Sequence, residues 1–545
     1  MNRRFLMSAA IAISTPLIAS AQMTIYVDDD APNDIGPNNP NLSDPLEDGT
    51  IDHPFDRINE AIDASANGDT VLIRAGTYLD SATINTDGKA ITIRGEDGAA
   101  NTIVDGFASP ESIMVIDSGE GPATVIEGLT LQGGNDGTGG ALEILGATTS
   151  PVIRDCVFRF NTTPVDGSAV NVTAPSTSLT ARARFEDCVF ENNTATGSAA
   201  GSNVDGTFAA IRTSPMLVRC TFRNNTAAAG AGFWATQSAG ATLLDCVFET
   251  NDNVRDGTVY IVSSSNVEIR GSRFLRNTGN GGPAIYVENS SVLVSRCELL
   301  GNTSGNLGGA MLLDSCDVTV TNSTIIGNTA LNDGGAVAIR DSGSCFFENC
   351  TITANFAADS IGGVFPVGAG NLATLLNTIC IDNTSGTPST TTNFGGTSNA
   401  SVYATSYSIV PTADLPAGAD VGDGNFVADP MFVSAPDPGM DGMWGTADDD
   451  YGDVRLMASL SPAIDAGDSV HYMGPLADLD SADRAQDDPD VLDTGLAIAT
   501  PTIDIGAFEV QAGGPPPSCV GDFNGDGLIN GADLATLLSV WGMCP

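Results

Sequence analysis

The sequence predicts an all-β protein whose body is a right-handed parallel β-helix, a solenoid with a short N-terminal capping helix and a small C-terminal calcium-loop module. Three observations predict the solenoid: a repeat of 25 to 32 residues, short runs of alternating apolar and polar residues, and glycine, asparagine and aspartate between the runs. Each repeat is too short for a strand-helix-strand crossover. It therefore makes one coil, stacked on the next at about 4.8 Å.

The repeat is clearest in a seven-residue phrase that begins with Asp155 and ends with Asn161. Cys156 and Phe158 fall on inward-facing positions, so coils are expected to stack cysteine on cysteine or serine, and phenylalanine on phenylalanine, leucine or isoleucine. Glycine pairs between the copies allow bends with positive φ. Copies lie at 187–193, 219–225 and 245–251, weaker copies centre on 274–277, 299–302, 325–328 and 352–355, and glycine pairs lie at 139–140, 281–282, 308–309, 334–335 and 362–363.

Nine of the 11 cysteines lie in the repeats. Because they recur at an inward position, we expect buried free thiols, with some disulfides as the alternative. Cys519 and Cys544 instead bracket a very small exported module, where a disulfide is expected as a stabilising link.

The N-terminus predicts export. Arg3 and Arg4 precede an apolar run over 5–18 that ends in small residues, so residues 1–21 form a signal peptide cleaved before Gln22. The run is too short to span a bilayer, and no later segment has the required length without charges or glycines, so no membrane span is expected. We therefore expect a secreted protein, extracellular or on the cell surface.

The chain is strongly acidic, with 67 acidic residues against 21 basic ones and a formal net charge of −46. A surface of this charge repels phosphate, which excludes nucleic acid as a partner. Solubility outside the cell, in salt or calcium, is the main interpretation of the charge. A specific cationic ligand is the alternative.

Two resemblances support this fold. The alternating Phe-x-x-Asn and Gly-Gly-Ala motifs over 139–364 resemble the repeats of chlamydial polymorphic outer-membrane proteins, which are β-helical. Residues 54–78 resemble the start of pectin-lyase-like β-helices, which implies a short amphipathic helix with Phe55, Ile58 and Ile62 on the face that covers the open first coil. The expected division is a cap over 22–69 and a parallel β-helix over 70–428.

Residues 429–512 are Asp-rich and read differently. The phrases at 461–467 and 504–509 resemble the closing region of exported β-helix proteins, so we expect the C-terminal end of the β-helix here. Within it, residues 441–450 concentrate carboxylates around glycines. This stretch is interpreted as a solvated acidic turn, with a site for a hard cation as the alternative.

After a linker over 513–518, residues 519–545 contain the spacing of a twelve-residue calcium loop. Gly527 falls at the position of the sharp turn, and the spacing supplies hard oxygen ligands from one short loop. The predicted calcium ligands are Asp522, Asn524, Asp526, Asn530 and Asp533 through their side chains and Leu528 through its backbone carbonyl.

The loop and the helix that follows resemble one half of a dockerin, the module that attaches secreted enzymes to a scaffold. The apolar stripe of this helix is Leu534, Leu537, Leu538 and Trp541. A dockerin normally has two such halves, and Gly531 and Ala532 replace residues that are often hydroxylated there. The resemblance therefore implies a single-loop anchoring or sorting tag, closed by a disulfide, with a scaffold or sorting partner.

No catalytic signature is recognisable. The chain has two histidines, His53 and His471, neither of them in a repeat, and it lacks the arginine-proline-arginine signature of lyases and the glycine-histidine-glycine signature of hydrolases. The sequence favours a non-catalytic adhesin or a protein that binds extracellular polysaccharide or another surface ligand. A divergent polysaccharide lyase or hydrolase is the alternative. The candidates for lining a groove are Arg182, Arg184, Arg212, Arg255 and Arg270, beside Asp205 or Asp256.

An oxidised peptide covering 519–545 is expected to bind one calcium ion and gain helix, because the cation relieves repulsion among the loop carboxylates. Asp522→Ala and Asp533→Ala should each weaken binding strongly, whereas reduction of the disulfide should weaken it less. The control is Asp490→Ala in the intact protein, which should leave binding unchanged. Calorimetry checks this, and no calcium uptake at millimolar concentration would show the assignment to be wrong.

Overall fold

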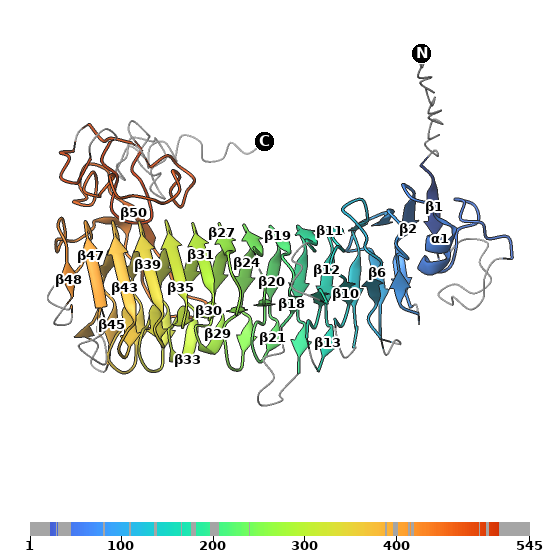
Figure 1. Ribbon diagram of the computed structural model, residues 1–545, viewed down its shortest axis with the longest axis horizontal. Helices are drawn as coiled ribbons and strands as arrows, with labels where there is room; N and C mark the ends of the chain where they lie inside the picture. Colours follow the sequence, from blue (N-terminus) through green and yellow to red (C-terminus); the bar gives the residue numbers. More distant parts are fainter. Residues whose placement is uncertain are drawn as a thin grey trace, which may run out of the picture.

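The computed structural model describes residues 22–511 apart from 29, 31–44, 80–81, 108–110, 136–138, 165, 176–180, 197–205, 239, 387–389, 396–401, 412–414, 416–418, 485, 490 and 498–500. These residues form the predicted all-β solenoid (Figure 1). The predicted signal peptide over 1–21, the predicted linker over 513–518 and the predicted calcium module over 519–545 lie outside the described residues.

In the part of the chain that the structure describes, four sheets run along the solenoid. Sheet A has 15 strands from β1 (Thr24–Val27) to β48 (Asp420–Val421), and sheet B has 12 from β3 (Gly76–Tyr78) to β44 (Ile379–Ile381). Sheet C has 11 strands from β4 (Ile84–Asn85) to β42 (Val364–Val367), and sheet D has 10 from β13 (Thr162–Thr163) to β46 (Thr390–Thr391). Apart from β46, which pairs antiparallel with β45 (Thr384–Ser385), the strands of these sheets pair in parallel with their counterparts in the neighbouring coil, so side chains at equivalent positions lie directly above one another.

One coil shows how the repeat folds. It runs through β23 (Thr242–Leu244) in sheet A, β24 (Val247–Glu249) in sheet B, β25 (Asp252–Asn253) in sheet D and β26 (Val259–Val262) in sheet C. Two-residue turns join the first three strands, and each begins with a residue of positive φ, at Asp245 (54°) and Thr250 (53°). Such left-handed residues suit Asn, Asp and Gly, which explains the composition of the turns.

The inward phenylalanines stack as predicted. The ring centroids of Phe190 and Phe222 are 4.4 Å apart, and those of Phe248 and Phe274 are 4.8 Å apart, with the rings within 10° of parallel. The column continues through Leu299 and later isoleucines. Parallel pairing imposes this face-to-face arrangement, because each ring sits one strand spacing above the last.

Asparagines form a second buried column at the turn between sheets B and D. The side chain of Asn251 donates to the Phe222 carbonyl and to Asn277 Oδ1, both at 3.0 Å, and its Oδ1 accepts the Asn225 backbone N–H at 3.1 Å. These hydrogen bonds satisfy amides that are fully buried. The other members include Asn161, Asn193, Asn302, Asn328, Asn355 and Asn383.

The nine repeat cysteines are buried free thiols, as expected. The expected single inward position holds for six of them, whereas Cys316, Cys345 and Cys380 lie elsewhere in their coils. Serine takes the cysteine position in some coils, where the Ser272 hydroxyl accepts the Cys246 N–H at 3.1 Å and the Ser323 hydroxyl accepts the Cys297 N–H at 3.0 Å. Burial raises the pKa of Cys156 and of Cys297 to about 12. The thiols of Cys156 and Cys297 are therefore protonated and unreactive in the folded protein.

The N-terminal end is covered by helix α1 (Ile58–Ala64), whose residues Ile58, Ala61 and Ile62 are buried. Phe55 packs against the same core but lies outside the helix, in a β-bridge with Val27, so the predicted apolar face is confirmed for Ile58 and Ile62 and not for Phe55. Strand β1 precedes the helix in the chain and pairs with β2 (Thr70–Ile73). In the described part of the chain, no helix has the length and apolar character needed to cross a membrane.

The chain then reverses, and residues 429–511, here called the C-terminal segment, lie alongside the last coils (Figure 1). The segment contains the antiparallel pair β49 (Phe432–Ser434) and β50 (Asp453–Leu456). Val454 and Phe508 of the segment pack against the outward-facing Leu300 and Ile326 of sheet B. The segment therefore covers part of the solenoid surface and does not add coils.

Asn251→Ala is expected to destabilise the protein by about 3 kcal/mol, because the Asn225 N–H, the Phe222 carbonyl and Asn277 Oδ1 each lose a buried partner. The control is Asn224→Ala, in an exposed left-handed turn position of the preceding coil, which should cost about 1 kcal/mol. Guanidinium unfolding measures both values. Equal losses would contradict the structural role of the buried column.

Candidate functional site

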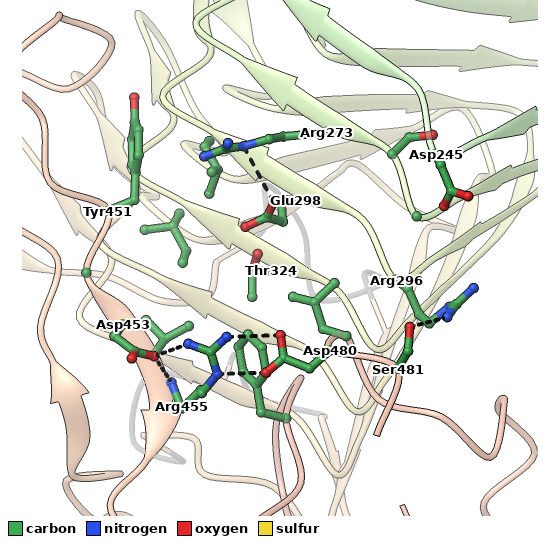
Figure 2. A pocket seen from close by; sticks show the side chains of 18 residues that line it. Asp245, Arg273, Arg296, Glu298, Thr324, Tyr451, Asp453, Arg455, Asp480 and Ser481 are labelled. Carbon is green, nitrogen blue, oxygen red and sulfur yellow. Dashed lines mark hydrogen bonds and ion pairs between the residues drawn. The ribbon is translucent and has the colours of Figure 1, made fainter. Parts of the chain in front are cut away.

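A cleft of about 560 Å³ lies between sheet B and the C-terminal segment (Figure 2). The solenoid wall is formed by β28 (Arg273–Leu275), β32 (Glu298–Leu300) and β36 (Thr324–Ile326), together with the turns that precede them. The opposite wall includes residues of β50 and of a later loop. The polar lining residues are Asp245, Arg273, Arg296, Glu298, Thr324, Tyr451, Asp453, Arg455, Asp480 and Ser481.

The outward positions of the solenoid wall face the C-terminal segment, and Leu300 and Ile326 both line the cleft and contact the segment. Arg273 and Glu298 lie at the first outward position of their strands, where they line the cleft. The second outward positions, Leu275 and Leu300, belong to the apolar cluster that holds the segment. The alternation of a strand thus supplies both the polar wall of the cleft and its apolar support.

Ion pairs fix most of the charged groups. Arg455 makes a bidentate contact with Asp480, at 2.7 and 3.0 Å, and also contacts Asp453 Oδ1 at 3.0 Å. Arg273 Nε lies 3.5 Å from Glu298 Oε2. Figure 2 shows these groups converging from the two walls.

Arg296 differs from the other two arginines. Its guanidinium donates to Ser481 Oγ at 2.9 Å, and within the described residues it has no carboxylate partner. It is half-buried at the turn between sheets A and B. It is therefore the cationic group of the cleft that is most available to a ligand.

Tyr451 lines the cleft and stacks with Trp444, which lies outside the lining. The rings of Trp444 and Tyr451 stack with centroids 6.0 Å apart, and the Tyr451 hydroxyl donates to Asp449 Oδ2 at 3.0 Å. Both rings lie on glycines, since a Cβ atom at Gly301 would collide with Tyr451 and one at Gly327 with Trp444. The four preceding coils carry Asn192, Asn224, Thr250 and Arg276 at this turn position, so glycine replaces larger residues where the two rings lie.

A buried arginine anchors the C-terminal segment. Arg484 is enclosed, and its guanidinium donates to Asn322 Oδ1 at 2.7 Å and to the Gly506 carbonyl at 2.6 Å, and pairs with Glu509 Oε2 at 3.3 Å. A buried charge requires such a complete set of partners. Asn322 belongs to the solenoid, so this network ties the segment to the coil beneath it and positions the second wall of the cleft.

The carboxylates of residues 441–450 cap their own backbone. Asp449 Oδ2 accepts the N–H groups of Gly445 and Thr446 at 2.8 and 3.0 Å, and Asp441 Oδ1 accepts the Met443 N–H at 2.8 Å. This arrangement agrees with the interpretation as an acidic turn.

The arginines predicted to line a groove are not brought together. Arg184 and Arg270 pair with neighbouring glutamates on the outer face of sheet A, and Arg212 bonds the Ala174 carbonyl. Asp205 lies outside the described residues. Of the predicted set, Arg255 and Asp256 remain together, beside sheet C.

Asp256 lies near a pair of stacked tyrosines, Tyr260 and Tyr286, with ring centroids 5.0 Å apart. Tyr260 donates to Glu288 Oε2 at 2.7 Å. Burial, and then repulsion from Glu288, raise the pKa of Asp256 to about 6, although Arg340 and Arg255 oppose the shift. This carboxyl group therefore keeps its proton over a pH range in which an exposed aspartate is ionised.

Because the pKa of Asp256 is raised, the folded state binds more protons than the unfolded state between about pH 4 and 6, and this contribution to stability is lost as the pH rises through that window. Asp256→Asn should equal the native protein at pH 4 and exceed it by about 1–2 kcal/mol at pH 8. Urea midpoints at the two pH values measure the difference. Asp252→Asn, an exposed aspartate four residues away, should show no such gain, and equal behaviour of the two variants would contradict the assignment.

Three comparisons place this structure among known folds. Residues 205–384 match the family model described as a right handed beta helix region. No curated protein matches the chain. This match to a β-helix family model agrees with the four sheets described above.

Similar solved structures share little sequence with this chain. The catalytic unit of the GH87 alpha-1,3-glucanase from Streptomyces thermodiastaticus has a TM-score of 0.36 at 14% identity, and the match covers 68% of this chain and 65% of the glucanase unit. Pectate lyase Pel9A has a TM-score of 0.33 at 14% identity, covering 90% and 97%. The A-module of the Azotobacter vinelandii mannuronan C-5 epimerase AlgE6 has a TM-score of 0.32 at 14% identity, covering 69% and 95%. The protein is a right-handed parallel β-helix whose structural neighbours include polysaccharide lyases and glycoside hydrolases.

Proposed function

We propose that this is an exported β-helix protein that binds an extracellular polysaccharide in the cleft between sheet B and the C-terminal segment, without cleaving it. The observation that carries the proposal is the lining of the cleft, in which ion pairs hold arginines and carboxylates in place beside two aromatic rings. Fixed donors, acceptors and apolar faces suit a hydroxyl-rich chain, because little side-chain entropy is lost on binding.

Charge supports the same ligand class. The cleft contains three arginines and four carboxylates, a formal charge of −1, whereas the whole chain carries −46. A neutral or weakly acidic chain can therefore approach this site with far less repulsion than elsewhere on the molecule. Arg296 offers a guanidinium that a hydroxyl or carboxylate of the ligand would pair with.

The ion pairs favour binding over cleavage. Hydrolysis of a glycoside normally uses one protonated and one ionised carboxyl group. Three of the four cleft carboxylates, Glu298, Asp453 and Asp480, each contact an arginine, so among the described residues the cleft does not present a pair of free carboxyl groups. Neither histidine lines the cleft. A divergent polysaccharide lyase or glycoside hydrolase is the alternative, and it is tested in the same experiment.

The proposal also gives a role to the predicted calcium module over 519–545. The calcium-loop spacing over 522–533 and its resemblance to half a dockerin support attachment or sorting through a calcium-bound module, outside the cell or at its surface. The partner would be a scaffold or sorting protein that recognises the loaded module. The body would then present the cleft to polysaccharide.

The test is retention of the full-length protein in gels that contain polyuronates, sulfated glycans or neutral glucans. At least one class should retain the protein, and Arg296→Ala should weaken retention about tenfold or more, the cost of one charge-assisted hydrogen bond. Arg219→Ala is the matched control, because Arg219 occupies the same turn position in an uncovered coil and pairs with Asp187 outside the cleft.

The same incubations are scored for 4,5-unsaturated ends and for new reducing ends. Neither should form. Release of either product, abolished by loss of a cleft carboxylate, would replace binding by catalysis. If no glycan class retains the protein, the proposal is overturned.

A further inference from the structure

A separate group of acidic side chains lies in the C-terminal segment, and none of its members lines the cleft. Carboxylate oxygens of Asp465, Asp487 and Asp493 lie within 4.8 Å of one another. Among the described residues this is the one group of three or more potential ligands that could share an ion. Proximity alone does not make a metal site, so the burial and the hydrogen bonds of each side chain decide whether the group suits a cation.

Asp465 provides the second observation. The residue is fully buried, with 0% of its surface exposed, and within the described residues its Oδ1 has no hydrogen-bond partner. Its Oδ2 accepts the Asp488 backbone N–H at 3.3 Å. An unpaired oxygen of a buried carboxylate is costly, particularly beside two other carboxylates, and a bound cation removes the cost.

The backbone holds the group together. The Asp465 N–H donates to Asp504 Oδ1 at 2.8 Å, and the Asp465 carbonyl accepts the N–H groups of Thr494 and Gly495 at 2.9 and 3.1 Å. The loop that carries Asp493 is therefore tied to Asp465 without any ion. Asp487 and Asp493 are exposed, which leaves the site open to solvent on one side.

We propose that Asp465, Asp487 and Asp493 form a calcium site in the C-terminal segment, independent of the predicted loop at 522–533. All three donors are hard carboxylate oxygens, which excludes metals that prefer nitrogen or sulfur. Calcium accepts six to eight oxygens in irregular geometry, so water can complete a site with three protein ligands on the open side. Magnesium demands a near-ideal octahedron, which ligands from three separate stretches of chain do not readily supply.

The position of this site connects it to the cleft. Asp465 and Asp487 lie at the two ends of a stretch that carries Asp480 and Ser481, both on the cleft wall. An ion bound to both ends closes this stretch into a loop. It stabilises the conformation that presents Asp480 to Arg455, since a ligand that binds only the folded arrangement favours it.

The test uses full-length, chelator-treated protein in which Asp522→Asn and Asp533→Asn silence the predicted tail loop. Titration with calcium chloride to about 5 mM covers the affinities of extracellular modules. One ion per chain should bind, and adding Asp465→Asn or Asp487→Asn should weaken binding about tenfold or more. Asp97→Asn, the same charge change on an exposed turn of the N-terminal coils, should leave the affinity unchanged.

Hydrogen exchange locates the ion in the native protein. Peptides within 460–497 should be protected by calcium chloride and not by magnesium chloride at the same concentration. Asp487→Asn gives the check on folding, because its side chain is exposed and the core does not depend on it. No uptake by the tail-silenced protein, uptake that both Asn variants retain, or equal protection by magnesium would overturn the proposal. None of these outcomes depends on whether the cleft binds polysaccharide.

Discussion

Parallel pairing in strict register is the constraint on which this molecule depends, because each side chain must pack against its own equivalent one coil away. An inward position therefore favours residue types whose side chains pack well against the same residue type in the next coil. Phenylalanine does so by stacking, and asparagine does so because its amide is both donor and acceptor. A charged residue does not, and the outward positions show how the chain manages this: Arg159, Glu191, Arg223 and Glu249 alternate in sign along sheet B.

The same rule explains where the solenoid surface changes character. After Glu249, the column of alternating charge is replaced by Leu275, Leu300 and Ile326, and these are the residues that the C-terminal segment covers. The turn position beside them also changes, from Asn224, Thr250 and Arg276 to Gly301 and Gly327 beneath the aromatic pair. The solenoid sequence therefore departs from the repeat where the C-terminal segment packs. The cleft lies where the surface of the solenoid and that of the segment separate.

Local periodicity made most of the fold predictable. The coil length, the inward phenylalanines, the free thiols and the capping helix follow from residues that are close in sequence or one repeat apart. The path of the C-terminal segment was not accessible in this way, because it depends on contacts such as that of Arg484 with Asn322, 162 residues away. The cleft was missed for the same reason, although the apolar run at 299–300 and 325–326 was a signal that this face is covered. The predicted groove of arginines was wrong: Arg184 and Arg270 pair with glutamates on their own strands of sheet A, and Arg212 bonds a backbone carbonyl.

The nine buried cysteines have a consequence for the lifetime of the molecule. In the folded state the thiols are enclosed, so an oxidant in solution does not reach them. Once the coils separate, nine thiols become available together, and oxidation would pair them without regard to the register of the native coils. Unfolding in such an environment is then chemically irreversible. The protein's persistence there is governed by the height of its unfolding barrier and not by its equilibrium stability.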